Sequence, residues 1–230
     1  MQQDHFSIPV IIGDTLSRDD VKALSAEPHI LQDCNLAGVD LSDLDLCDWT
    51  FERCDLRETN FSGAQLERSR WISCRAGSSH WIESDLGEAD FRSSDCNNAN
   101  FWRCWITATR FIGCKLTGAD LTDTRGIGWT LEEVLLIGAR LKGRSFRKAK
   151  LVRIDFSQAD LERCDFRGAV FSGCSLREAQ LDGAFFDGAD LRGADLGGLQ
   201  LADLGLLRGA ILSGEQAADL LSAMGVKIIG

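Results

Sequence analysis

The sequence lacks several features that would assign it to a common functional class. It has no apolar run near the roughly 18 residues that a membrane-spanning helix needs, so no membrane association is expected. It has no excess of basic residues, because 25 Lys and Arg stand against 35 Asp and Glu, for a net charge of −10. A simple nucleic-acid-binding protein would usually be basic. No basic region precedes an apolar stretch at the N-terminus, which argues against a signal peptide.

The usual signatures of catalysis and of metal or cofactor binding are also missing. The three histidines, His5, His29 and His80, are far apart and do not have metal-ligand spacing. No glycine-rich phosphate loop or dinucleotide fingerprint occurs, and no CxxC pair is present. The sequence therefore predicts a protein that is not an enzyme and holds no cofactor or metal, and it leaves a binding function.

A strict five-residue period is the dominant feature of the sequence. From Leu31 to Leu206, 33 of 36 positions spaced five apart are Leu, Phe, Ile or Trp, and the exceptions are Ala76, Cys96 and Gly126. The position two residues before each large one is small at 28 of 35 sites between Cys34 and Leu204. This period fits neither an α-helix nor a β-strand. It predicts a solenoid in which each repeat is covered by its neighbours.

The cysteines follow the same period. Seven of the nine occupy the small position, namely Cys34, Cys54, Cys74, Cys104, Cys114, Cys164 and Cys174. This placement is typical of reduced thiols that serve as small core residues. Together with the missing signal peptide, it predicts a cytoplasmic protein.

The repeat unit resembles the pentapeptide repeat family, A(D/N)LXX, as in Ala-Asp-Phe-Arg-Ser at 89–93. The resemblance implies an all-β fold, a right-handed quadrilateral parallel β-helix with twenty residues per coil. Residues twenty apart would then stack about 4.8 Å apart, so that aromatic side chains stack on aromatic side chains. Three such columns are predicted: Phe51, Trp71, Phe91 and Phe111; Phe61, Trp81 and Phe101; and Phe146, Phe166 and Phe186.

Both ends depart from the repeat and predict caps. Residues 1–30 contain a strand candidate at 6–12 and a short helix after Ser17, with Asp20 as its capping partner. Residues 31–211 form the repeat domain. Residues 212–230 form a capping and dimerisation segment, in which Ser213 and Gln216 make a capping box, Gly225 ends the helix, and 226–229 is a strand candidate. We expect a homodimer through apolar residues of this segment: Leu212, Leu220, Leu221, Met224, Val226 and Ile228.

Charge is unevenly distributed along the chain. Residues 155–203 carry ten acidic and four basic residues, whereas 61–154 carry ten acidic and fifteen basic residues, including a run without acids at 140–153. In a C-terminal dimer, the acidic segments of the two copies would join into one negative surface. This surface would resemble the one that a DNA duplex presents to a basic groove. The predicted partner-binding carboxylates are Asp155, Asp160, Glu162, Asp165, Glu178, Asp182, Asp187, Asp190 and Asp195.

The C-terminal sequence, Gly209 to Leu212 followed by 216–221 and 226–230, is similar to that of the Qnr and MfpA group of pentapeptide repeat proteins. The segment 128–134 also resembles the mid-chain discontinuity of this group. The resemblance implies a dimeric DNA mimic that binds DNA gyrase or topoisomerase IV and protects it from quinolones or other poisons. A structural or interaction scaffold with another protein partner is the alternative.

Irregular positions complete the predicted binding residues. Trp102 and Trp105 fall at outward positions, with Ile82 one coil earlier, and they mark either a contact surface or packing against a flanking segment. Gly126 occupies a large position, while Trp129 and Arg144 occupy small ones. An inward Arg without a partner is costly, so a bulge or kink is expected within 124–146. We include Trp102, Trp105 and Trp129 among the predicted contacts.

Overall fold

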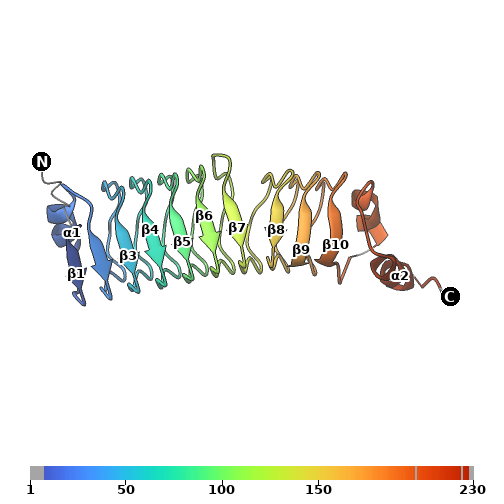
Figure 1. Ribbon diagram of the computed structural model, residues 1–230, viewed down its shortest axis with the longest axis horizontal. Coiled ribbons are helices and arrows are strands. Elements are labelled where there is room, and N and C mark those ends of the chain that lie inside the picture. Colours follow the sequence, from blue (N-terminus) through green and yellow to red (C-terminus); the bar gives the residue numbers. More distant parts are fainter. Residues whose placement is uncertain (1–7, 200, 224, 228–230) are drawn as a thin grey trace, which may run out of the picture. The chain divides into compact units, whose positions relative to one another are not determined.

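The computed structural model describes residues 8–199, 201–223 and 225–227, apart from the side chains of 201–203. The chain divides into two compact units, Met1–Lys115 with Thr124–Thr130, and Leu116–Asp123 with Leu131–Gly230. Each unit is a parallel β-solenoid in which a strand recurs every twenty residues (Figure 1). This confirms the predicted fold class.

In the first unit, each strand pairs in parallel with the next one along the chain. Leu31 lies opposite Phe51, Phe51 opposite Trp71, and Phe91 opposite Phe111, so the register is twenty residues. The strands are β1 (Val10–Ile12), β2 (Ile30–Gln32), β3 (Thr50–Glu52), β4 (Arg70–Ile72), β5 (Asp90–Arg92) and β6 (Arg110–Ile112).

The second unit repeats this pairing. Glu132 of β7 lies opposite Val152, and Leu151 lies opposite Phe171. The strands are β7 (Thr130–Glu132, whose first residue belongs to the first unit), β8 (Lys150–Val152), β9 (Val170–Ser175) and β10 (Asp190–Asp195). The pairing of β9 with β10 shifts register around Gly193. A Cβ atom at Gly193 would lie 2.5 Å from the carbonyl oxygen of Phe171, so only glycine fits there.

Each coil has four faces, which we number in chain order. Face 1 carries the strands. On the other faces, single bridges join residues twenty apart: Asn35 to Asp55 on face 2, Asp40 to Asn60 on face 3, and Asp45 to Gln65 on face 4. The second unit has bridges at the corresponding positions of its own coils, for example Asp155 to Ser175, Asp160 to Gln180 and Asp165 to Phe185.

The core consists of the large and small positions of the repeat, and the predicted aromatic columns are confirmed. Phe51 and Trp71 stack with ring centroids 4.1 Å apart, and Phe61 and Trp81 with centroids 4.3 Å apart. In the second unit, the Phe166 ring lies 5.0 Å from the Phe146 ring and 5.1 Å from the Phe186 ring. Such offset stacks contribute beyond the burial of apolar area.

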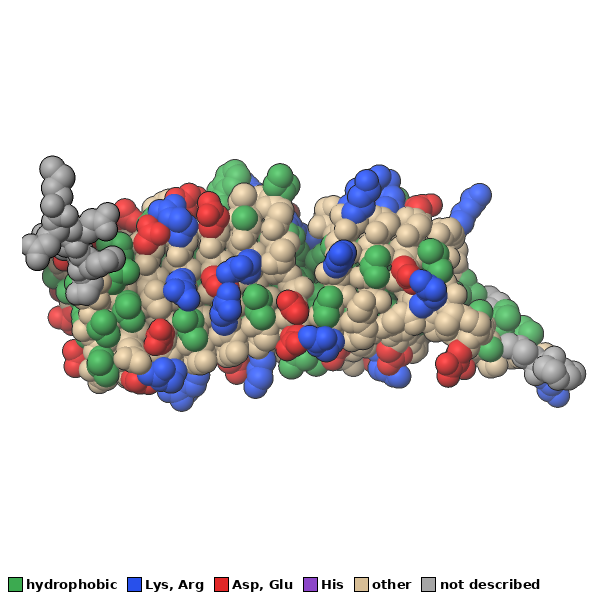
Figure 2. Space-filling model, in the orientation of Figure 1, with side chains coloured by type: hydrophobic (Ala, Val, Ile, Leu, Met, Phe, Trp, Pro, Cys, Tyr) green, Lys and Arg blue, Asp and Glu red, His purple; other side chains and the backbone are tan. Residues whose placement is uncertain are grey.

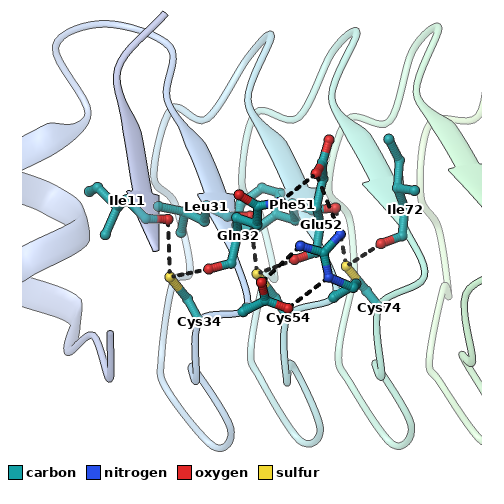
Figure 3. A network of polar contacts seen from close by, with 11 residues as sticks. Ile11, Leu31, Gln32, Cys34, Phe51, Glu52, Cys54, Ile72 and Cys74 are labelled. Carbon is teal, nitrogen blue, oxygen red and sulfur yellow. Dashed lines mark hydrogen bonds and ion pairs between the residues drawn. The ribbon is translucent and has the colours of Figure 1, made fainter. Parts of the chain in front are cut away.

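The cysteines at the small position combine apolar packing with hydrogen bonding. Cys34, Cys54 and Cys74 lie on three consecutive coils (Figure 3). The Cys54 thiol donates to the Leu31 carbonyl at 3.3 Å, and the Cys74 thiol to the Phe51 carbonyl at 3.2 Å, in each case on the preceding coil. All nine cysteines are free, and burial raises the pKa of the Cys104 and Cys164 thiols to about 12. The Cys104 and Cys164 thiols are therefore structural rather than reactive.

The N-terminal cap follows the predicted local rules. Helix α1 (Arg18–Leu24) begins with a capping box, in which the Ser17 side chain accepts from the Asp20 amide and the Asp20 carboxylate accepts from the Ser17 amide. Val21 is buried, and Arg18 donates to the carbonyls of Asp40 and Ser42 at 2.8 and 2.9 Å. Of the strand expected over 6–12, residues 10–12 form β1, residues 8 and 9 do not belong to a strand, and residues 6 and 7 lie outside the described residues.

The C-terminal helix is also present. In α2 (Gly214–Ala223), the capping box of Ser213 and Gln216 is formed in both directions. After α2, the Gly225 amide donates to Ser222 and the Val226 amide to Leu221, which is a Schellman ending. The strand predicted for 226–229 is wrong for residues 226 and 227, which have no strand pairing, because Val226 completes this helix ending. Residues 228 and 229 lie outside the described residues.

Two further irregularities modify the sequence-based picture. The five-residue frame runs to Leu206 in the sequence, but the backbone leaves it earlier, because residues 201–207 form the 3-10 helix η1 (Leu201–Leu207). At 126–129, a bend replaces the regular two-residue turn, and Gly126 has a φ of +104°. The expected distortion is therefore present there. It does not extend to Arg144, where the turn is regular and the side chain is half-buried.

Candidate protein-interaction surface

Five of the nine predicted carboxylates have a structural role in their own turn. Asp155, Asp160, Asp165, Asp190 and Asp195 precede a large position, and each accepts a hydrogen bond from the backbone amide two residues later. The corresponding distances lie between 2.9 and 3.2 Å. This is the local bonding that Asp side chains favour in turns. Their occurrence is thus explained by the repeat before any partner is considered.

The structure does not bring the nine carboxylates to a single face. Asp190 belongs to face 1 and Asp160 to face 3. By the twenty-residue register, Asp155, Glu178 and Asp195 belong to face 2, Glu162 and Asp182 to face 3, and Asp165 and Asp187 to face 4. The negative surface expected from the count over 155–203 is therefore divided among four directions.

Four of the nine carboxylates are paired with cations. Arg177 contacts Asp195 at 2.9 Å, and Lys142 pairs with Glu162. Arg167 lies 2.7 Å from Asp165 and lowers the pKa of that carboxyl to about 2. Arg192 does the same for the pKa of Asp190 at the same distance. Within the described residues, no ion pair joins Asp155, Asp160, Glu178, Asp182 or Asp187 to Lys or Arg.

The basic run at 140–153 is partly neutralised by the same stacking. Arg140 contacts Asp120 at 2.6 Å one coil earlier, and Arg153 pairs with Glu133. Arg147 lies 3.7 Å from Asp165 on the next coil. Burial lowers the pKa of Arg144. Acidic and basic side chains are accordingly intermixed on the face seen in Figure 2.

The predicted tryptophans all belong to the first unit. Trp105 is 45% exposed on face 4, and the Arg125 guanidinium lies over its ring at 5.3 Å from the centroid. Trp102 on face 3 and Trp129 at the bend are half-buried, and Arg103 lies over Trp102 at 4.4 Å. Trp102 and Trp105 are thus brought together around one corner of the coil.

Sequence reasoning missed two parts of this surface. Ile127 lies in the bend at 126–129 and is 82% exposed, and the glycine at the large position 126 is the sequence signal of this irregularity. On face 4, the coils before Trp105 carry Asp45, Asp48, Glu67, Asp85 and Glu88. Grouping the residues by their position within the twenty-residue coil would have placed these carboxylates on the same face as Trp105.

The predicted dimerisation residues lie on or beside α2. No described residue of α2 is buried. Leu212 and Leu220 are half-buried, while Leu221 and Val226 are 40% and 45% exposed. Met224 and Ile228 lie outside the described residues. The Gln216 side chain holds the helix against β10 by donating to the carbonyls of Leu191 and Ala194, both at 2.7 Å.

A cavity of about 420 Å³ lies between β10 and α2. Both basic and acidic side chains line it, including Arg177, Asp195 and Asp219. Across the part of the chain that the structure describes, no group of three or more His, Cys, Asp or Glu is arranged to hold a metal ion. Within the same residues, no helix has the length and apolar character needed to cross a membrane.

Comparisons with known proteins agree with this architecture. A model described as "Pentapeptide repeat region" matches residues 30–101, and one described as "Pentapeptide repeats (8 copies)" matches 84–123, 130–163 and 159–198. No protein of curated function matches the sequence significantly.

Solved structures of QnrB1, a plasmid-mediated fluoroquinolone resistance protein, share the fold. A trypsin-treated variant has 20% identity and a TM-score of 0.61, covering 96% of this chain and 98% of that one. Full-length QnrB1, also 20% identical, has a TM-score of 0.55 over 95% of this chain and 98% of that one. The five-residue frame, the twenty-residue coil and the two matching models together show that this chain belongs to the pentapeptide repeat family.

Proposed function

We propose that this protein binds a bacterial type II topoisomerase, DNA gyrase or topoisomerase IV, and protects it from quinolones or other poisons. The observation that carries the proposal is the likeness to QnrB1 along nearly the whole of both chains. The Qnr-like C-terminal sequence supports it. Trp102, Trp105 and Trp129, with the carboxylates of 155–195, are the proposed contacts.

The proposal includes a homodimer formed through 212–230. It is supported by the helix α2, whose apolar side chains are not buried within one copy: Leu220 is half-buried and Leu221 is 40% exposed. Removal of residues 212–230 is expected to give monomers in sedimentation velocity. Lys115→Gln, at an exposed position outside this segment, serves as the control and is expected to remain dimeric. If the truncated protein still sediments as a dimer, the proposed interface is refuted.

Gyrase supercoiling provides the functional test. Gyrase is inhibited with a quinolone, or in parallel with a peptide poison, and the protein is titrated in up to micromolar concentrations. Recovery of supercoiled product is the expected result, and inhibition of supercoiling by the protein alone would also support binding. If neither occurs with gyrase or topoisomerase IV, the proposal is rejected.

A specific observation favours a second function, that of an interaction scaffold for another protein. The predicted acidic surface is spread over four faces, and Glu162, Asp165, Asp190 and Asp195 are paired with cations. This arrangement is less suited to imitating a DNA duplex than the sequence count suggests, because paired carboxylates attract a basic groove weakly. A scaffold would leave supercoiling unchanged at every protein concentration.

A further inference from the structure

Face 4 of the first unit combines an exposed apolar patch with a row of carboxylates. The patch consists of Trp105, 45% exposed, and Ile127, 82% exposed, on adjacent coils. Trp102 lies around the neighbouring corner. Large apolar side chains exposed side by side mark contact surfaces more often than scattered ones do, and exposed tryptophan is a frequent anchor in interfaces.

The carboxylates lie on the same face as the patch. Asp85 is the bridge partner of Trp105 on the preceding coil, and Asp45 lies two further coils back. Glu88 donates its amide to Thr107 on the coil of Trp105. Asp48 and Glu67 share Arg68, at 2.8 and 3.3 Å. No ion pair within the described residues neutralises Asp45, Asp85 or Glu88.

The spacing of the coils defines the length of this surface. At about 4.8 Å per coil, the coil of Asp45 lies about 14 Å from that of Trp105 and about 19 Å from that of Ile127. An extended segment rises about 3.3 Å per residue, so about six residues span it. Arg125, over the Trp105 ring, makes the Ile127 end positive, while the other end is negative. The surface therefore carries positive charge at its Ile127 end and negative charge at its Asp45 end.

We propose that face 4 of the first unit binds an extended protein segment with an apolar anchor followed by Lys or Arg side chains. The anchor packs on Trp105 and Ile127, and the basic side chains lie along Asp85, Glu88 and Asp45. The charge complementarity favours this occupant over a nucleic acid, whose phosphates the carboxylates would repel, and over an acidic segment.

The second unit offers a matched control on the same face. Phe185 is 47% exposed, and Arg167 lies over its ring at 5.1 Å, much as Arg125 lies over Trp105. The preceding coils, however, carry Arg147 and Lys148, and the single carboxylate of the column, Asp165, is paired with Arg167. Phe185 thus has a comparable aromatic exposure without the row of carboxylates.

The test uses the full-length protein and a fluorescently labelled peptide of two leucines followed by alternating lysine and serine, with binding measured by anisotropy at low salt. Trp105→Ala combined with Ile127→Ser is expected to weaken binding at least about tenfold. Asp85→Asn combined with Glu88→Gln is expected to weaken it about fivefold and to flatten its salt dependence. Phe185→Ser is expected to change it less than about twofold. Circular dichroism verifies folding.

Three results would overturn the inference. The first is equal binding of a peptide in which serines replace the leucines, since attraction would then be purely ionic. The second is equal binding of a peptide in which glutamates replace the lysines. The third is tighter binding of oligothymidylate, which would make the tryptophans a base-stacking surface. The assay contains no topoisomerase, so its failure and a failure in the supercoiling assay are distinguishable.

Discussion

Face 4 has opposite charge in the two units although the repeat is the same. In the first unit, its outward positions hold five carboxylates against Arg68 and Arg125. In the second unit, they hold Asp165 and Asp187 against Arg147, Lys148 and Arg167. The count along the sequence does not show this difference, since 31–60 in the first unit and 155–203 in the second both have a net charge of −6. The difference shows that charge must be counted per face in a solenoid, because consecutive pentapeptides point in different directions.

Core substitutions are expected to produce the largest effects. Trp71→Ala removes a ring stacked between Phe51 and Phe91, and Phe166→Ala one stacked between Phe146 and Phe186. Each should lower the unfolding free energy by about 3–5 kcal/mol, as measured by urea denaturation. If the units unfold independently, each substitution will shift only one of two transitions. A loss below about 1 kcal/mol in either unit would contradict the role of the stacks.

The caps of the two units use the same device and should respond alike. Arg18 on α1 and Gln216 on α2 each donate to two backbone carbonyls. Arg18→Met and Gln216→Glu remove these donors, and each should cost about 1–3 kcal/mol. Limited proteolysis should show faster cleavage at the affected end. Gln216→Glu keeps the oxygen that accepts from the Ser213 amide, but its second oxygen faces the carbonyls of Leu191 and Ala194, so its cost includes repulsion as well as the two lost contacts.

Exchanging charge between the units would sharpen the comparison further. Arg147→Glu combined with Lys148→Glu gives the Phe185 surface an acidic neighbourhood. In the anisotropy assay, the background of Trp105→Ala and Ile127→Ser should then regain peptide affinity by about threefold. Arg147→Gln with Lys148→Gln is the neutral control and should regain less. If peptide affinity does not increase, then peptide binding to face 4 of the first unit requires more than carboxylates beside an exposed aromatic ring.

The smallest expected effect is the pH dependence of the ion pairs. Arg167 lowers the pKa of Asp165 to about 2 from 3.8, so the pair stabilises the folded state fully above the unfolded pKa and loses this contribution as pH falls towards 2. The difference in unfolding free energy between the wild type and Arg167→Gln should therefore shrink between pH 5 and 2. Arg57→Gln should behave alike, because Arg57 lowers the pKa of Asp55 in the first unit. A difference that grows on acidification would contradict this.

Local patterns predicted much of the fold. The aromatic stacks followed from residue spacing together with the twenty-residue coil that the family resemblance implied. Both capping boxes followed from residues three apart in sequence, Ser17 with Asp20 and Ser213 with Gln216. The stacks depend on the regular backbone of the coil, and the capping boxes depend on residues that are close in the sequence. The candidate surface was harder to predict, because Asp85 contacts the coil of Trp105 only when the chain has turned through twenty residues. The departure of Leu201 and Leu206 from the frame had no signal in the period.

The sequence by itself determined the solenoid and the identity of its core residues, because a large side chain every fifth residue is buried when coils stack on one another. The twenty-residue length of the coil came from the resemblance to the pentapeptide repeat family. Only the tertiary structure decided which charges meet. Stacking pairs Arg140 with Asp120 and Arg177 with Asp195, divides the C-terminal carboxylates among four faces, and places Asp85 beside Trp105. Electrostatic attraction depends on distance in space, and in this fold the charged neighbours of a side chain include residues about twenty positions away.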